Sequence, residues 1–156
     1  MAAVEFALIA PWFFWLMVGL GELTMIGLAQ TSLDFALSET ARQIRTGELQ
    51  AAGLTEQQFK NNVCNEMIIG GNCGAMSIDV RSYQGFADVQ IDSPIDPATG
   101  QLRTNFAFQP GQASNIVVVR AFYNWDVVTP LFQGMFANIG TQRVLASTVL
   151  FRNEPF

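Results

Sequence analysis

The most constraining feature of this sequence is a long N-terminal run with almost no charge. From Phe6 to Ala29 the only charged side chain is Glu22, and the run is rich in aromatic and aliphatic residues. As an α-helix, these 24 residues rise about 36 Å, enough to cross the hydrocarbon core of a bilayer. We therefore expect a helix that inserts into a membrane or into an equally apolar protein core. The alternatives are the core helix of a soluble protein and a cleaved secretory signal, although a signal would have a basic start and a small-residue cleavage site.

The side preceding this run lacks the positive charge that normally orients a membrane helix. Lys and Arg collect on the cytoplasmic side of such helices, but the first cation here is Arg42. Our hypothesis is that a basic leader has been removed, so that Met1 begins a processed chain. The bulk of the protein would then lie outside the cytoplasm.

Two carboxylates interrupt the apolar region, and a carboxylate in hydrocarbon needs a partner or a function. Glu5 lies one helical turn from the N-terminus, so its charge can be matched by the α-ammonium group of Met1 in a neighbouring copy, the pairing that the family resemblance given below favours. The alternative is that Glu5 is solvated among lipid headgroups. Glu22 is expected to be interfacial or hydrogen-bonded. The two carboxylates are 17 residues apart, or roughly 100° around a helix, which does not support a paired-carboxylate active site.

Three residues of the apolar run weaken a helix locally. Pro11 lacks a backbone donor and clashes with the preceding turn, while Gly19 and Gly21 are poor helix formers. We interpret them as softening a helix that must leave a membrane and repack. Proline and glycine are also ordinary in membrane helices, so this interpretation has a simpler alternative.

Beyond Gln30 the pattern becomes amphipathic, which predicts that the same helix leaves the membrane and continues to about Glu48. Its apolar positions in this part are Leu33, Phe35, Ala36, Leu37, Ala41 and Ile44. We therefore divide the chain into residues 1–29, the transmembrane or filament-core half of the helix, and residues 30–156. The second part is expected to be an extracytoplasmic globular domain that includes the amphipathic half of the helix.

The rest of the chain predicts an α+β domain. Thr55 and Gln58 have the spacing of a capping box, which begins a short second helix that ends at Gly70 and Gly71. Alternation predicts a strand over 76–81, and 86–91 is expected to return beside it. The stretch 115–125 is apolar on both faces, which indicates a central strand. A short helix near 129–139 and a last strand over 144–151 complete an antiparallel sheet of about four strands.

Cys64 and Cys73 are the only cysteines, and a short loop separates them. We predict a disulfide, which places the domain in an oxidising compartment. A metal site is the alternative, but two thiolates in a chain without histidine are too few ligands for tetrahedral zinc.

Composition argues against several function classes. The net charge of −5, with only eight Lys and Arg, does not supply the cationic surface that nucleic acids require. The absence of histidine removes the side chain most used in acid/base catalysis. Asp92 and Asp96 do not have the spacing of a calcium loop. There is also no phosphate-binding loop or nucleophile elbow, so we expect no enzyme, cofactor or metal site.

Several stretches together resemble TadE-like proteins of tight-adherence (Tad) pili. The start, Ala2 to Pro11 (AAVEFALIAP), is similar to the start of that family. The C-terminal part resembles the family at 117–120 (VVVR), 123–125 (YNW), 129–131 (TPL) and 150–156 (LFRNEPF).

The resemblance implies a pilin-like fold, in which a long hydrophobic helix packs on a small sheet. It implies cleavage by a prepilin peptidase that leaves glutamate as the fifth residue, a register that Glu5 fits. It also implies assembly by an inner-membrane platform, together with copies of itself or other pilins, into or at the tip of an adhesive pilus. The alternative is a bitopic membrane protein that never polymerises and serves as a scaffold or binding protein for pilus assembly.

Overall fold

The computed structural model describes residues 2–156 and has an α+β fold, as the sequence predicted. The helices are α1 (Ala2–Arg45), α2 (Glu48–Ala52), α3 (Glu56–Glu66) and α4 (Pro130–Phe136). The strands are β1 (Met76–Tyr83), β2 (Ile116–Asp126) and β3 (Gln142–Arg152). Two short 3-10 turns, Cys73–Ala75 and Phe86–Asp88, lie in the connections.

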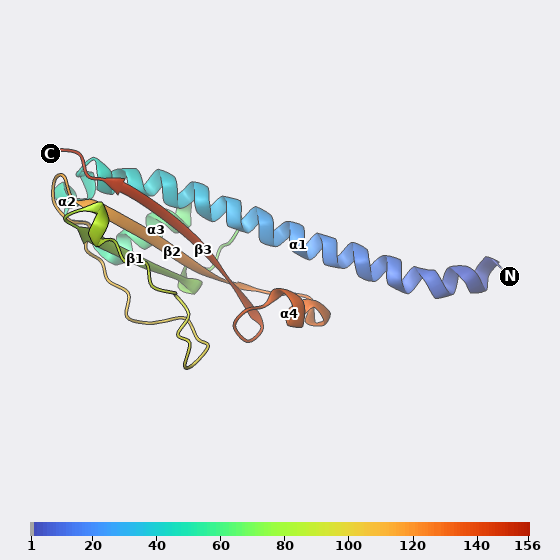
Figure 1. Ribbon diagram of the computed structural model, residues 1–156. Coiled ribbons are helices and arrows are strands. Elements are labelled where there is room, and N and C mark those ends of the chain that lie inside the picture. Colours follow the sequence, from blue (N-terminus) through green and yellow to red (C-terminus); the bar gives the residue numbers. More distant parts are fainter. Residues whose placement is uncertain (1) are drawn as a thin grey trace.

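Helix α1 is far longer than the domain that it belongs to. Its N-terminal half projects away from the sheet, and its C-terminal half lies along it (Figure 1). The buried positions of the second half follow the three-and-four spacing of one helix face: Ile26, Ala29, Leu33, Ala36, Leu37, Ala41 and Ile44. The helix ends at Arg45, where Gly47 adopts a left-handed φ of 79°, and α2 begins at Glu48. Phe35, expected on the apolar face, is exposed instead.

Helix α3 begins with the predicted capping box. The backbone N–H of Gln58 donates to the Thr55 hydroxyl, and the backbone N–H of Thr55 donates to the Gln58 side chain at 2.9 Å. The helix buries Phe59 and Val63 and carries Cys64, which forms the predicted disulfide with Cys73. Their Cα atoms lie 5.7 Å apart, so the bridge ties the end of α3 to the start of β1.

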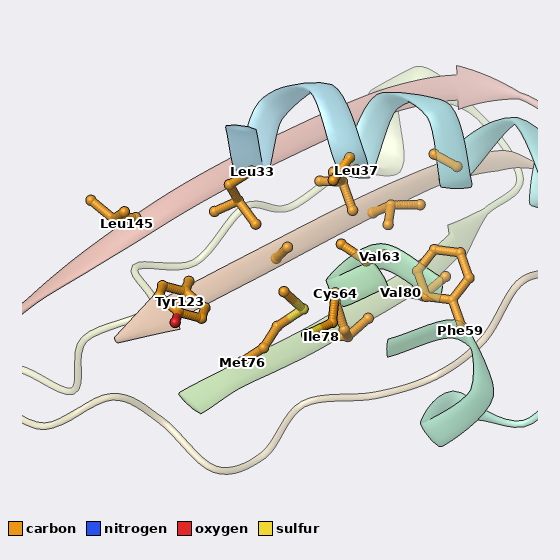
Figure 2. Close-up of a cluster of buried hydrophobic side chains, with 14 of the residues drawn as sticks. Leu33, Leu37, Phe59, Val63, Cys64, Met76, Ile78, Val80, Tyr123 and Leu145 are labelled. Carbon is orange, nitrogen blue, oxygen red and sulfur yellow. The ribbon is translucent and has the colours of Figure 1, made fainter. Parts of the chain in front are cut away.

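The sheet has three antiparallel strands in the order β1-β2-β3, so β2 is central, as predicted. Helices α1 and α3 cover one of its faces. In Figure 2 Leu33 and Leu37 of α1 and Phe59 and Val63 of α3 meet the strand side chains across the core. The strands contribute Met76, Ile78, Val80, Val117, Val119, Ala121, Tyr123 and Leu145.

The second face of the sheet is covered by the long connection between β1 and β2, residues 84–115. Phe106 of this connection stacks on Phe122 with ring centroids 5.2 Å apart. At the edge of β1, the backbone of 107–109 also bonds both polar groups of Val80, with the Val80 N–H donating to the Ala107 carbonyl at 2.7 Å. This cover explains why β2 is apolar on both faces.

The prediction of about four strands was wrong, because 86–91 does not return beside β1. Phe86 opens a 3-10 turn, and Phe86 and Ile91 are both exposed. Strand β1 pairs with β2 on one side. Part of the other edge of β1 is occupied by the backbone of 107–109. An alternating apolar pattern shows that a segment could form a strand, but it does not identify the edge that the segment would join.

Candidate assembly surface

The N-terminal half of α1 presents a continuous apolar surface. Its most hydrophobic 18-residue window has a mean hydropathy of 1.8, and only 6% of that window is buried. Within residues 2–156, α1 is the one helix long and apolar enough to cross a membrane. Its exposed large apolar side chains are Val4, Phe6, Leu8, Ile9, Trp12, Phe13, Phe14, Trp15, Leu16, Met17, Val18, Leu20, Leu23, Met25 and Leu28. Because these side chains face outward, this segment is not a core helix of the chain's own domain.

The acidic residue expected to act in assembly lies in the first turn of α1. Glu5 is exposed, and the residues next to it in the helix include the exposed apolar Val4, Phe6 and Leu8. Its predicted partner, the α-ammonium group of Met1, lies outside the described residues. The pairing therefore stays a prediction. Pro11 is inside α1, and the helix continues through it.

Gly19 and Gly21, grouped by the sequence as helix-softening residues, have different surroundings. Gly19 is buried beneath α4, and a Cβ atom there would lie 2.8 Å from the Cζ of Phe132. The same ring lies against Trp15, with centroids 5.1 Å apart. At Gly21 an added Cβ would meet no atom within 4 Å. Gly19 thus allows α4 to approach α1 closely, whereas Gly21 faces open space.

Glu22 is hydrogen-bonded, which is one of the two roles that the sequence predicted for it. Its carboxylate accepts from the backbone N–H of Val128 at 3.1 Å, the backbone N–H of Thr129 at 3.2 Å and the Thr129 hydroxyl at 2.7 Å. Thr129 directly precedes α4 and makes no side-chain cap of its own. Glu22 therefore satisfies donors just before α4 and fixes this short helix to α1.

This attachment of α4 to α1 joins residues more than a hundred positions apart, and sequence reasoning missed it. Figure 1 shows α4 at the end of the sheet nearest the projecting half of α1. A signal was present in the sequence, because residues 127–142 contain no charge although they link two strands of a domain expected to face water.

The apolar half of α1 differs from the rest of the described surface. Within residues 2–156 no group of three or more His, Cys, Asp or Glu side chains is placed to hold a metal ion. The hollow between α1 and α3 is lined mainly by amides and charged side chains, including Glu39, Gln43, Asn62 and Glu66. The surface that most needs a partner is the exposed apolar half of α1.

The similarity of this chain to known proteins lies in α1. The family model described as TadE-like protein matches residues 1–42, which correspond to α1 almost in full. No curated protein and no solved structure matches the chain significantly. The match confirms the resemblance noted at Ala2 to Pro11, and it leaves the C-terminal similarities untested. Residues 1–42 therefore match the TadE-like family, a structural family associated with Tad pili.

Proposed function

We propose that this chain is a structural subunit of a Tad-type pilus, inserted in the inner membrane before assembly and then packed into, or at the tip of, an extracellular filament. The observation that carries the proposal is the length of exposed apolar helix in α1, which a protein free in water would not leave uncovered. Residues 1–29 act as the membrane and filament-core half, and residues 30–156 form the extracytoplasmic domain. The expected partners are other pilins, the assembly platform and the prepilin peptidase.

The connection between the two parts supports a load-bearing role. The buried stripe of α1 continues the exposed half without a break, so the domain and the apolar segment share one helix. Ser32 on α1 accepts hydrogen bonds from the backbone N–H groups of Ile68 and Ile69 at 2.8 and 3.1 Å. Arg45 at the end of α1 forms an ion pair with Glu154 at 3.2 Å. A force applied along α1 is thus passed to several parts of the domain.

Hydrophobicity alone does not favour a filament over lipid, because both surround α1 with apolar atoms. Close packing of side chains and the pairing of polar groups must then favour the assembled state. Glu5 is the group with most to gain, because it is a charged residue in the first turn of a helix half whose exposed large side chains are apolar. A neighbouring copy's α-ammonium group supplies the opposite charge.

Glu5→Ala tests the proposal. We expect the variant to insert into the membrane at the normal level but to be strongly reduced in filaments sheared from the cell surface. Glu39→Ala is the matched control, since Glu39 is an exposed acid on the same helix but lies beyond the apolar half. Normal recovery of Glu5→Ala in sheared filaments would refute the assembly role of Glu5.

The location of the unmodified chain separates the proposal from the non-polymerising alternative. Mass spectrometry of sheared filaments should detect this chain if it is a subunit. Complete retention in the inner-membrane fraction, with filaments present but free of this chain, would instead support a bitopic scaffold.

A further inference from the structure

A small apolar patch lies exposed on α4 and the turn before it. Val128, Leu131 and Met135 are 78%, 69% and 64% exposed. The uncharged stretch 127–142 surrounds them, with Asp126 and Arg143 as the nearest charges on either side. We call Val128, Leu131 and Met135 the α4 patch.

The α4 patch is held at a defined height along α1. Phe132 lies against Trp15 and over Gly19, and the two residues before α4 donate to Glu22. From Trp15 to Glu22 the helix rises about 10 Å. The α4 patch therefore lies beside residues 15–22 of α1. Figure 1 shows the rest of the domain on the side of this level toward the C-terminal end of α1.

This level coincides with the outer limit of a membrane that α1 would span. From Ala3 to Glu22 the helix rises about 30 Å, the thickness of the hydrocarbon core, so residues 23–29 of the apolar half lie among and beyond the headgroups before assembly. Glu22 then lies at the boundary with the headgroups, where the N–H groups of Val128 and Thr129 satisfy its carboxylate. The α4 patch lies beside that boundary, within the 5–10 Å depth at which interfacial helices bury their apolar side chains.

We propose that the α4 patch inserts into the outer leaflet of the bilayer, so that this chain contacts the membrane through two elements before assembly. Helix α1 spans the bilayer, and α4 lies in the interface and holds the domain against the surface. The inference rests on the membrane insertion of α1 that the proposed function includes. Lipid is the occupant that fits, because α4 packs on the apolar half of α1 through Phe132 and its stretch carries no charge. A protein partner fits less well, because a stable protein–protein interface buries roughly 1,200 Å² or more and three side chains supply far less area.

Photolabelling from within the bilayer tests the proposal. The full chain is reconstituted in vesicles of phosphatidylethanolamine and phosphatidylglycerol that contain a phospholipid with a diazirine on its acyl chain, and the adducts are mapped by mass spectrometry. We expect adducts in 127–142 as well as in the apolar half of α1. Leu131→Asn/Met135→Asn should lower labelling of 127–142 at least fivefold and leave labelling of α1 unchanged. Both side chains are exposed, so the double variant keeps the packed core.

Ile68 provides the matched control. It is 84% exposed and follows α3, and its backbone bonds Ser32, ten residues beyond Glu22 on α1. Ile68 should receive no adducts, and Ile68→Asn should not change labelling of 127–142.

Three results would overturn the inference. Adducts in α1 but none in 127–142 would refute the role of the α4 patch and leave the insertion of α1 intact. Cross-links between copies at 127–142, in place of lipid adducts, would show that a second chain covers the patch. An absence of adducts in α1 would refute the membrane insertion of the proposed function itself.

Discussion

Asp79 of β1 and Arg120 of β2 are direct cross-strand partners, and their side chains form an ion pair on the face of the sheet opposite α1. The Arg120 Nε donates to Asp79 Oδ2 at 3.0 Å, and both side chains are more than nine-tenths buried. The same pair holds the connection 84–115 in place. Arg120 donates to the Asp92 carbonyl at 2.7 Å, and the Ala107 N–H donates to Asp79 at 2.9 Å. A charged pair thus anchors a connection that contains little regular structure.

Removing one member of this pair should destabilise the domain strongly. Asp79→Leu leaves the Arg120 guanidinium buried without its counter-charge, a situation that costs about 3–5 kcal/mol in the free energy of unfolding. The double variant Asp79→Leu/Arg120→Leu removes both charges and should be more stable than the single variant. Urea unfolding of the full chain in detergent measures both. Glu39→Gln, which breaks an exposed pair with Arg42 at 3.8 Å, should change stability by less than about 1 kcal/mol.

The pair of Asp79 and Arg120 should also make the free energy of unfolding depend on pH. Burial alone would raise the pKa of Asp79, but the Ala107 N–H and the guanidinium groups of Arg120 and Arg81 outweigh it, so the pKa lies below the ordinary 3.8. A carboxyl with a lowered folded-state pKa contributes stability above its unfolded-state pKa. This contribution should be complete above about pH 4 and lost as the pH falls through the lower value in the folded chain. Urea unfolding at a series of pH values should show that loss in the unmodified chain and a smaller one in Asp79→Leu/Arg120→Leu.

The disulfide between Cys64 and Cys73 should stabilise the domain by limiting its unfolded state. A bridge that closes a loop of this length contributes about 2–3 kcal/mol on the chain-entropy model. Cys64→Ser/Cys73→Ser should therefore unfold at lower urea concentration, and adding a reductant should shift the unmodified chain but not the double variant. An equal response of both proteins to reductant would contradict this prediction.

Gly19 and Gly21 should respond differently to the same substitution. Alanine is the better helix former by about 1 kcal/mol, and at Gly21 the added methyl group meets open space. At Gly19 it would lie 2.8 Å from the Phe132 ring and push α4 from its position. We expect Gly19→Ala to be less stable than Gly21→Ala by roughly 1–3 kcal/mol, measured by thermal unfolding in detergent. Equal stability would show that α4 moves freely, whereas recovery in Gly19→Ala/Phe132→Leu would support the clash.

Features that depend on neighbouring residues were readable in the sequence. The apolar run of α1, its amphipathic continuation, the capping box of Thr55 and Gln58, and the bridge between Cys64 and Cys73 were all predicted and are all present. Helical spacing, a cap and a short closed loop each involve residues within about ten positions of one another. Their stability is therefore set largely by local backbone geometry.

Contacts between distant segments were decided only by the tertiary structure. The sequence showed Glu22 as an acid needing partners, but its donors at Val128 and Thr129 follow from where the chain returns after β2. The covering of the second sheet face by 84–115, in place of a fourth strand, likewise depends on Asp79 and Arg120 meeting across two strands. The physical reason is that periodicity specifies which face of an element is apolar, whereas the choice of the segment that covers it depends on the packing of the whole chain.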